Sequence, residues 1–135
     1  LMGLIHDIGK VLLIKALAEY DQCAGLAASD ILTAVHEPHQ KFGGIILQRW
    51  EFTPEYIRVA DMHDTQKLFS STNKEVLVVH LANLLTRTIG FSPIDDDWLD
   101  LSDVESAKLL ELSASDLDEA SGDVKQIIET SATIF

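Results

Sequence analysis

The chain has 135 residues, 47% of them hydrophobic, and a formal net charge of −12 at pH 7. This length and composition are typical of one globular domain with a substantial core, and we expect a single domain over residues 1–135. The acidic balance argues against a nucleic-acid partner, because phosphate binding needs clustered lysines and arginines, and no apolar run approaches the roughly 20 residues that cross a membrane.

Three local features bear on the compartment and on the extent of the domain. Cys23 is the lone cysteine, which excludes an internal disulfide and favours a reducing cytoplasm. The acidic residues concentrate in residues 95–123 without the glycine and glutamate spacing of a calcium loop, so they predict a solvated acidic face. Leu1 stands inside an apolar segment with no capping residue before it, and we therefore expect the first helices of the domain to lie upstream of this sequence.

The apolar spacing predicts helices from the start of the chain. The first covers residues 3–20, with a break or kink at Gly9. After a loop, Ser29 or Asp30 can cap a short helix over residues 31–37, and a proline at position 38 fits the first turn of the next helix. One face of this next helix, which runs to about residue 50, holds His39, Phe42, Gly43, Ile46, Leu47 and Trp50. This spacing points the histidine inward with the core residues.

The following segment predicts a helix that Thr53 caps and Pro54 starts. His63 closes its inward face, on which Tyr56, Val59 and Ala60 also lie. This face therefore carries a second histidine toward the core.

The longest periodic segment covers residues 73–90 and ends at Gly90. His80 and Asn83 interrupt its apolar stripe. Two tail helices follow, with capping boxes predicted at Ser102 with Glu105 and at Ser115 with Asp118. No strand-like alternation of convincing length occurs, so the predicted class is all-α.

Several histidines therefore fall on inward faces or beside them. A buried imidazole without a partner costs about 1–3 kcal/mol, so each needs a hydrogen bond, a carboxylate or a metal ion. A single one is read as a satisfied core histidine. Several that converge with Asp7 favour a metal site, because imidazole nitrogen with carboxylate oxygen suits Zn, Fe, Mn or Ni.

The stretch "HDIGK", residues 6–10, resembles the doublet of the HD-domain phosphohydrolase superfamily, an all-helical metal-dependent fold. The whole chain resembles its HDOD branch more narrowly, a relative of the HD-GYP proteins. The stretches that carry this resemblance are "LIHDIGKVLL", "PHQKFGGIILQRWEFTPEYIRVADMHD", "VVHLANLLTRTIG" and "AKLLELSASDLDEA". The resemblance implies an HD-domain-like helical bundle in a bacterial regulatory protein.

The resemblance assigns roles residue by residue. His6 and Asp7 match the metal-binding doublet, and His39 and His63 match the additional histidines of the two-metal relatives. In active members Lys10 would lie near a phosphate, but here it is as easily a helix-end charge. The superfamily's first ligand lies on a helix before the doublet, which this sequence does not contain.

Two positions depart from the pattern. Asp64 stands where the two-metal relatives have a second histidine, and Asn83 stands in "ANLL" where the last ligand is an aspartate. An amide in place of a carboxylate removes one unit of charge from the ligand shell, and we expect a loss of at least 10-fold to 100-fold in metal affinity. No "GYP" triplet follows His39, so hydrolysis of cyclic dinucleotides is poorly supported.

Three hypotheses follow, of which the third is a plain helical scaffold in which the His6–Asp7 doublet occurs by coincidence. The first is a signalling module with a degenerate metal site, which acts through other signalling proteins or through fused sensory or output domains. The second is a working phosphohydrolase whose histidines and Asp7 hold Fe, Mn, Zn, Ni or Mg. The tail, with Ile127, Ile128, Ile134 and Phe135, can pack within the chain or against a second copy in a homodimer.

Overall fold

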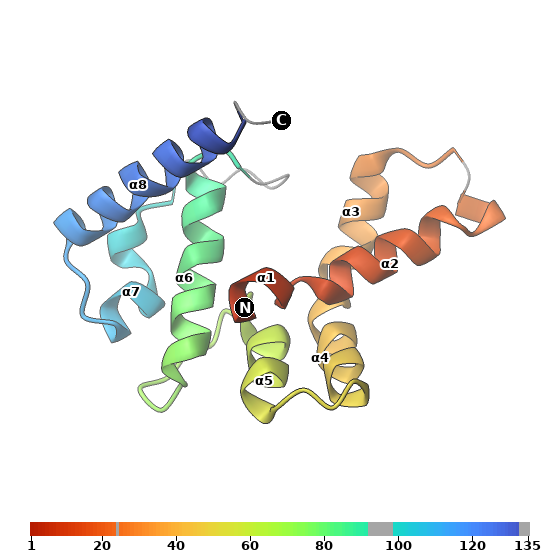
Figure 1. Ribbon diagram of the computed structural model, residues 1–135, viewed down its shortest axis with the longest axis horizontal. Coiled ribbons are helices and arrows are strands. Elements are labelled where there is room, and N and C mark those ends of the chain that lie inside the picture. The colour runs from red at the N-terminus through yellow and green to blue at the C-terminus, as the bar shows by residue number, and fades with distance from the viewer. Residues whose placement is uncertain (24, 92–98, 133–135) are drawn as a thin grey trace. The chain divides into compact units, whose positions relative to one another are not determined.

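The computed structural model describes residues 1–23, 25–91 and 99–132, apart from the side chains of residues 22 and 132. These residues form helices and contain no strand, which confirms the all-α class (Figure 1). They pack as two compact units, Leu1–Asp64 and Thr65–Phe135. The single-domain expectation stays a prediction. The acidic residues 95–97 and the apolar residues Ile134 and Phe135, to which the sequence assigned a role, lie outside the described residues.

Five α-helices build the first unit: α1 Met2–Ile5, α2 Ile8–Ala18, α3 Ala28–His36, α4 His39–Arg49 and α5 Pro54–Met62, with a short 3-10 helix at Asp21–Cys23. Helix α4 packs against both α2 and α5, α2 also contacts α3, and α1 contacts α5. The side chains of Val35, Leu47, Val59 and Ala60 are at most 1% exposed. The core of this unit is therefore formed by α3, α4 and α5.

The break in the first helix lies at the doublet and not at Gly9. Helix α1 ends at Ile5 and α2 starts at Ile8, so His6 and Asp7 form the turn between them. Gly9 is buried inside α2, where a Cβ atom would lie 2.0 Å from the carbonyl oxygen of His39 and 2.6 Å from the backbone nitrogen of Gly43. The glycine is therefore needed for a backbone-to-backbone contact between α2 and α4.

Other boundaries of this unit agree in part with the sequence. Helix α4 starts one residue after Pro38, and α5 starts at Pro54, as predicted. Thr53 occupies the N-cap position of α5, but its side chain makes no capping hydrogen bond and donates to Glu55 Oε2 instead. Helix α3 starts at Ala28, so Ser29 and Asp30 lie in its first turn and do not cap it. Trp50, which was expected on the inward face, follows the end of α4 and is 52% exposed.

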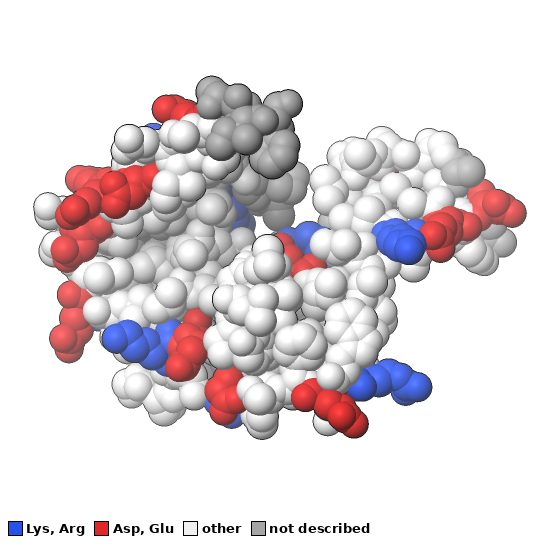
Figure 2. Space-filling view, viewed as in Figure 1, with Lys and Arg blue, Asp and Glu red and all other residues white. Residues whose placement is uncertain are grey.

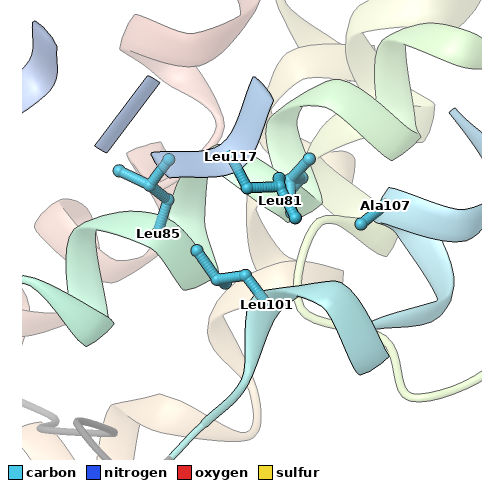
Figure 3. Close-up of a cluster of buried hydrophobic side chains, with 5 residues drawn as sticks. All are labelled: Leu81, Leu85, Leu101, Ala107 and Leu117. Carbon is cyan, nitrogen blue, oxygen red and sulfur yellow. The ribbon is translucent and has the colours of Figure 1, made fainter. Parts of the chain in front are cut away.

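The second unit contains α6 Lys74–Thr88, a 3-10 helix at Leu101–Asp103, α7 Glu105–Leu109 and α8 Ala114–Ala132. Its core is a cluster of buried side chains that α6 shares with the three later elements (Figure 3). The members of this cluster are Leu81, Leu85, Leu101, Ala107 and Leu117. Gly90 follows α6 with a φ of +78°, the left-handed conformation that the sequence predicted for a helix end.

Both predicted capping boxes of the tail are wrong in position. Ser102 lies in the 3-10 helix, where its backbone N–H and its hydroxyl donate to Asp100 Oδ1 at 2.9 and 2.7 Å. The box that starts α8 lies two residues before the predicted one. There the Ser113 backbone N–H donates to Asp116 Oδ2 at 2.8 Å, and the Asp116 backbone N–H donates to Ser113 Oγ at 3.2 Å. The sequence "SASDLD", residues 113–118, offers two registers, and the structure uses the first.

The surface carries the charge that the composition predicts. Figure 2 shows acidic side chains gathered along α8 on the visible face, whereas lysines and arginines are scattered. The exposed acids of this helix are Asp116, Asp118, Glu119, Asp123 and Glu129. Among the described residues, no helix combines the length and the hydropathy that a membrane span needs.

Candidate metal centre

Three helix junctions of the first unit bring the doublet and two further histidines together. His6 and Asp7 form the turn between α1 and α2, His39 is the first residue of α4, and His63 directly follows α5. His39 is 1% exposed and His63 is fully buried. The His63 ring lies 4.6 Å from that of His6 and 5.2 Å from that of His39, measured between ring centroids. We call these four residues the polar centre.

Hydrogen bonds to the backbone fix the tautomer of each imidazole. His6 Nδ1 donates to the carbonyl oxygen of Gly3 at 2.8 Å, and His63 Nδ1 donates to that of Ala60 at 3.0 Å. His39 Nδ1 donates in the same way to the carbonyl oxygen of His36. Because a carbonyl oxygen can only accept, each Nδ1 carries the proton and each neutral ring presents an unprotonated Nε2. This arrangement is typical of histidines that bind a metal through Nε2.

The unprotonated nitrogens face one carboxylate oxygen. Asp7 Oδ1 lies 3.2 Å from His63 Nε2 and 3.3 Å from His39 Nε2, and these two nitrogens lie 3.2 Å apart. With neutral rings all three atoms are acceptors. Asp7 Oδ1 is a buried atom, and among the described residues it accordingly receives no hydrogen bond. Three lone-pair donors this close repel one another unless a cation lies between them.

The triangle of these three atoms has the size of a metal ligand set. Ligands at about 2.1 Å from a metal ion, with angles between 90° and 109°, lie about 3.0–3.4 Å from one another. The three observed distances, 3.2, 3.2 and 3.3 Å, fall inside this range. His6 offers a further nitrogen, since one ligand atom each of His6, Asp7 and His63 lie within 4.8 Å of one another. The residues present therefore fit a single divalent ion.

The electrostatics keep these groups in the state that binds a metal. Burial is the largest cause that lowers the pKa of His6 and of His39, and the nearby Lys10 ammonium lowers the pKa of His39 further. Burial by itself raises the pKa of Asp7, but its contacts with His63 and with the Lys10 ammonium outweigh burial and hold that pKa well below the ordinary range. At neutral pH these two imidazoles are therefore uncharged and the carboxylate is ionised.

Lys10 borders the polar centre. Its Nζ donates to Asp7 Oδ2 at 2.8 Å, and its side chain is 24% exposed. The two oxygens of Asp7 thus have separate surroundings, with Lys10 Nζ and, at 3.7 Å, His6 Nε2 near Oδ2, and His39 and His63 around Oδ1. Lys10, for which the sequence left open a role near a phosphate or as a helix-end charge, forms an ion pair with Asp7 of the doublet.

The remaining polar residues of the apolar faces belong to the second unit. His80 in the second unit is 7% exposed, with Nε2 3.1 Å from the carbonyl oxygen of Thr65 and Nδ1 2.9 Å from Ser106 Oγ. It is therefore a core histidine with a hydrogen bond on each nitrogen. Asn83 is a half-buried residue of α6, and its backbone carbonyl oxygen accepts a hydrogen bond from Thr86 Oγ1 at 2.8 Å.

Sequence reasoning missed two contributors to the polar centre. His36 supplies the carbonyl oxygen that orients His39, and its Nε2 lies 3.8 Å from Asp64 Oδ2. The available signal was its spacing of three residues from His39. The side chain of the first residue of a helix can reach the backbone carbonyl oxygen three positions before it. Gly43 of α4 accepts the close approach of Gly9. Its role was not visible because the sequence does not show which helices touch.

A doublet at a helix break, two converging imidazoles and an all-α fold among the described residues fit an HD-type helical module. Residues 1–66, which contain the whole polar centre, match the model of the HDOD domain family. The resemblance that the sequence suggested is thereby confirmed for this part of the chain. Comparisons with curated proteins and with solved structures gave no match.

Proposed function

We propose that this chain is a bacterial, cytoplasmic signalling module of the HDOD kind that acts through contacts with other proteins or with attached sensory or output domains. In this proposal its polar centre can hold one divalent ion, such as Fe, Mn, Zn, Ni or Mg, but does not hydrolyse phosphate esters. The ion would join the starts of α2 and α4 to the end of α5. It would thus stabilise the surface that partners recognise.

One observation carries this proposal. Lys10, the cation that the resemblance would place near a phosphate, donates instead to Asp7 Oδ2 at 2.8 Å. The charge of the only carboxylate in the polar centre is thereby balanced before any ion or substrate enters. A phosphate ester would lose the positive side chain that stabilises its developing charge.

Two features of the sequence support the loss of hydrolysis. Asp64 and Asn83 stand where the two-metal relatives have a histidine and an aspartate. The first change leaves fewer nitrogen ligands for a second ion, and the second removes a negative charge from the ligand set that the resemblance implies. Both changes favour a binding module over an enzyme.

Turnover measurements test the proposal. The purified chain, supplied with Mn²⁺, is incubated with p-nitrophenyl phosphate and with a cyclic dinucleotide, and His63→Ala serves as the matched variant without the ligand triangle. We expect both proteins to release product no faster than Mn²⁺ alone. Turnover by the parent chain that disappears in His63→Ala contradicts the proposal.

A metal-dependent phosphohydrolase is the second candidate function. The ligand triangle favours it, because His39, His63 and Asp7 leave positions around an ion open. An ion held there would lower the pKa of a bound water and thereby supply the nucleophile for attack on a phosphate ester. The turnover measurements described above separate the two candidates directly.

A further inference from the structure

The contacts of Lys10 point to a role that neither the resemblance nor the proposed function assigns. Lys10 is the third residue of α2, and its ammonium lies 2.8 Å from Asp7 Oδ2 in an i,i+3 pair. Both side chains are largely shielded, at 24% and 29% exposure. A surface ion pair between flexible side chains contributes little, but this pair is held where the backbone of α2 touches that of α4 at Gly9.

We propose that Lys10 is a resident counter-ion that balances Asp7 while the polar centre holds no metal and thereby keeps metal binding weak and reversible. The proposal rests on the function proposed above and adds a regulatory property to it. The polar centre then has two charge-balanced states, one with the ammonium alone and one with an ion beside it. A change in ion concentration would switch the module between them.

The geometry separates the two cation positions. The ammonium contacts Oδ2, whereas the ligand triangle uses Oδ1 together with His39 Nε2 and His63 Nε2. Lys10 therefore does not block the triangle, and its effect on an ion is electrostatic. It lowers the negative charge that Asp7 offers to an ion, and its own positive charge repels the ion at short range.

Removal of the ammonium should have opposite effects on the two states. Without an ion, Lys10→Met leaves Asp7 without its balancing charge, and we expect the melting temperature to fall by about 3–8 °C. With an ion, the same variant should bind at least about tenfold more tightly, because one positive charge has left the polar centre. A residue that only supports the fold would weaken both properties together.

The test uses Mn²⁺ as the probe, with free Mn²⁺ followed by its electron paramagnetic resonance signal, and thermal unfolding measured in the presence of a chelator. Lys15→Met is the matched control, since Lys15 is an exposed lysine of the same helix. We expect this control to leave both readouts unchanged. Lys10→Arg retains the charge and should keep the affinity within about threefold of the parent chain.

Each outcome decides between the possibilities. Tighter binding together with a lower melting temperature in Lys10→Met supports the proposal, and so does a variant that is unfolded without ion and folds when Mn²⁺ is added. Unchanged or weaker binding, or a variant that stays unfolded at saturating Mn²⁺, overturns it. If neither the parent chain nor Lys10→Met binds Mn²⁺ at millimolar concentration, the metal centre of the proposed function fails as well.

Discussion

Substitution of Gly9 by alanine tests whether the close contact between α2 and α4 determines the distances within the ligand triangle. A Cβ atom at this position would lie 2.0 Å from the carbonyl oxygen of His39 and 2.6 and 2.9 Å from the backbone nitrogen and Cα of Gly43. These are backbone atoms of α4, so no side chain can rotate away from the new methyl group. Helix α2 must therefore move away from α4 by at least about 1 Å to reach ordinary van der Waals contact.

This displacement has two consequences of different size. Overpacking costs about 1–3 kcal/mol of unfolding free energy, and the better helix propensity of alanine returns at most about 1 kcal/mol. Asp7 lies two residues before Gly9, so its distances to His39 and His63, now 3.3 and 3.2 Å, should grow beyond those of ligands that share one ion. We expect Mn²⁺ affinity to fall at least about tenfold.

Urea unfolding and Mn²⁺ titration measure these two effects. Gly122→Ala is the matched control, because a Cβ atom at this exposed position of α8 meets no atom within 4 Å. It should raise the unfolding free energy slightly and leave Mn²⁺ binding unchanged. A Gly9→Ala protein with the stability and the Mn²⁺ affinity of the parent chain would refute the packing argument.

Three further predictions concern stability. Burial lowers the pKa of His6 and His39 below 6.5, so below about pH 6.5 the unfolded chain binds protons that the native chain does not. The unfolding free energy should therefore fall between pH 7 and pH 5, and urea midpoints that do not change with pH would contradict this. Ser106→Ala removes the hydroxyl beside His80 Nδ1 and should cost about 1–2 kcal/mol in urea unfolding, whereas a neutral result would mean that another group replaces the serine. Leu117→Ala opens the cluster of Figure 3 and should cost about 2–4 kcal/mol, and a loss below about 1 kcal/mol would show that this cluster is not a core.

The sequence predicted the elements of the fold better than their local details. The period of the apolar residues and the prolines at 38 and 54 predicted α4 and α5 to within about one residue, because these signals act within a single helix turn. The start of α8 was placed in the wrong register because two serine–acid pairs overlap there. Only the hydrogen bonds of Ser113 and Asp116 distinguish them.

The polar centre was predictable as a set of residues but not as a geometry. The doublet, His39 and His63 were identified from their faces and from the resemblance, and the structure brings them together. The tautomers could not be predicted, because they depend on carbonyl oxygens at Gly3, His36 and Ala60. The pairing of Lys10 with Asp7 also depends on the helix break, which the sequence placed at Gly9 instead of at the doublet.

The most direct test of the metal centre is the X-ray absorption spectrum of the chain loaded with one equivalent of Zn²⁺. Two or three imidazole nitrogens at about 2.0–2.1 Å, lost in His63→Ala, are the predicted ligands. A zinc ion bound only by water and carboxylate oxygens, or by sulfur from Cys23, would contradict the assignment of the unprotonated Nε2 atoms as ligands.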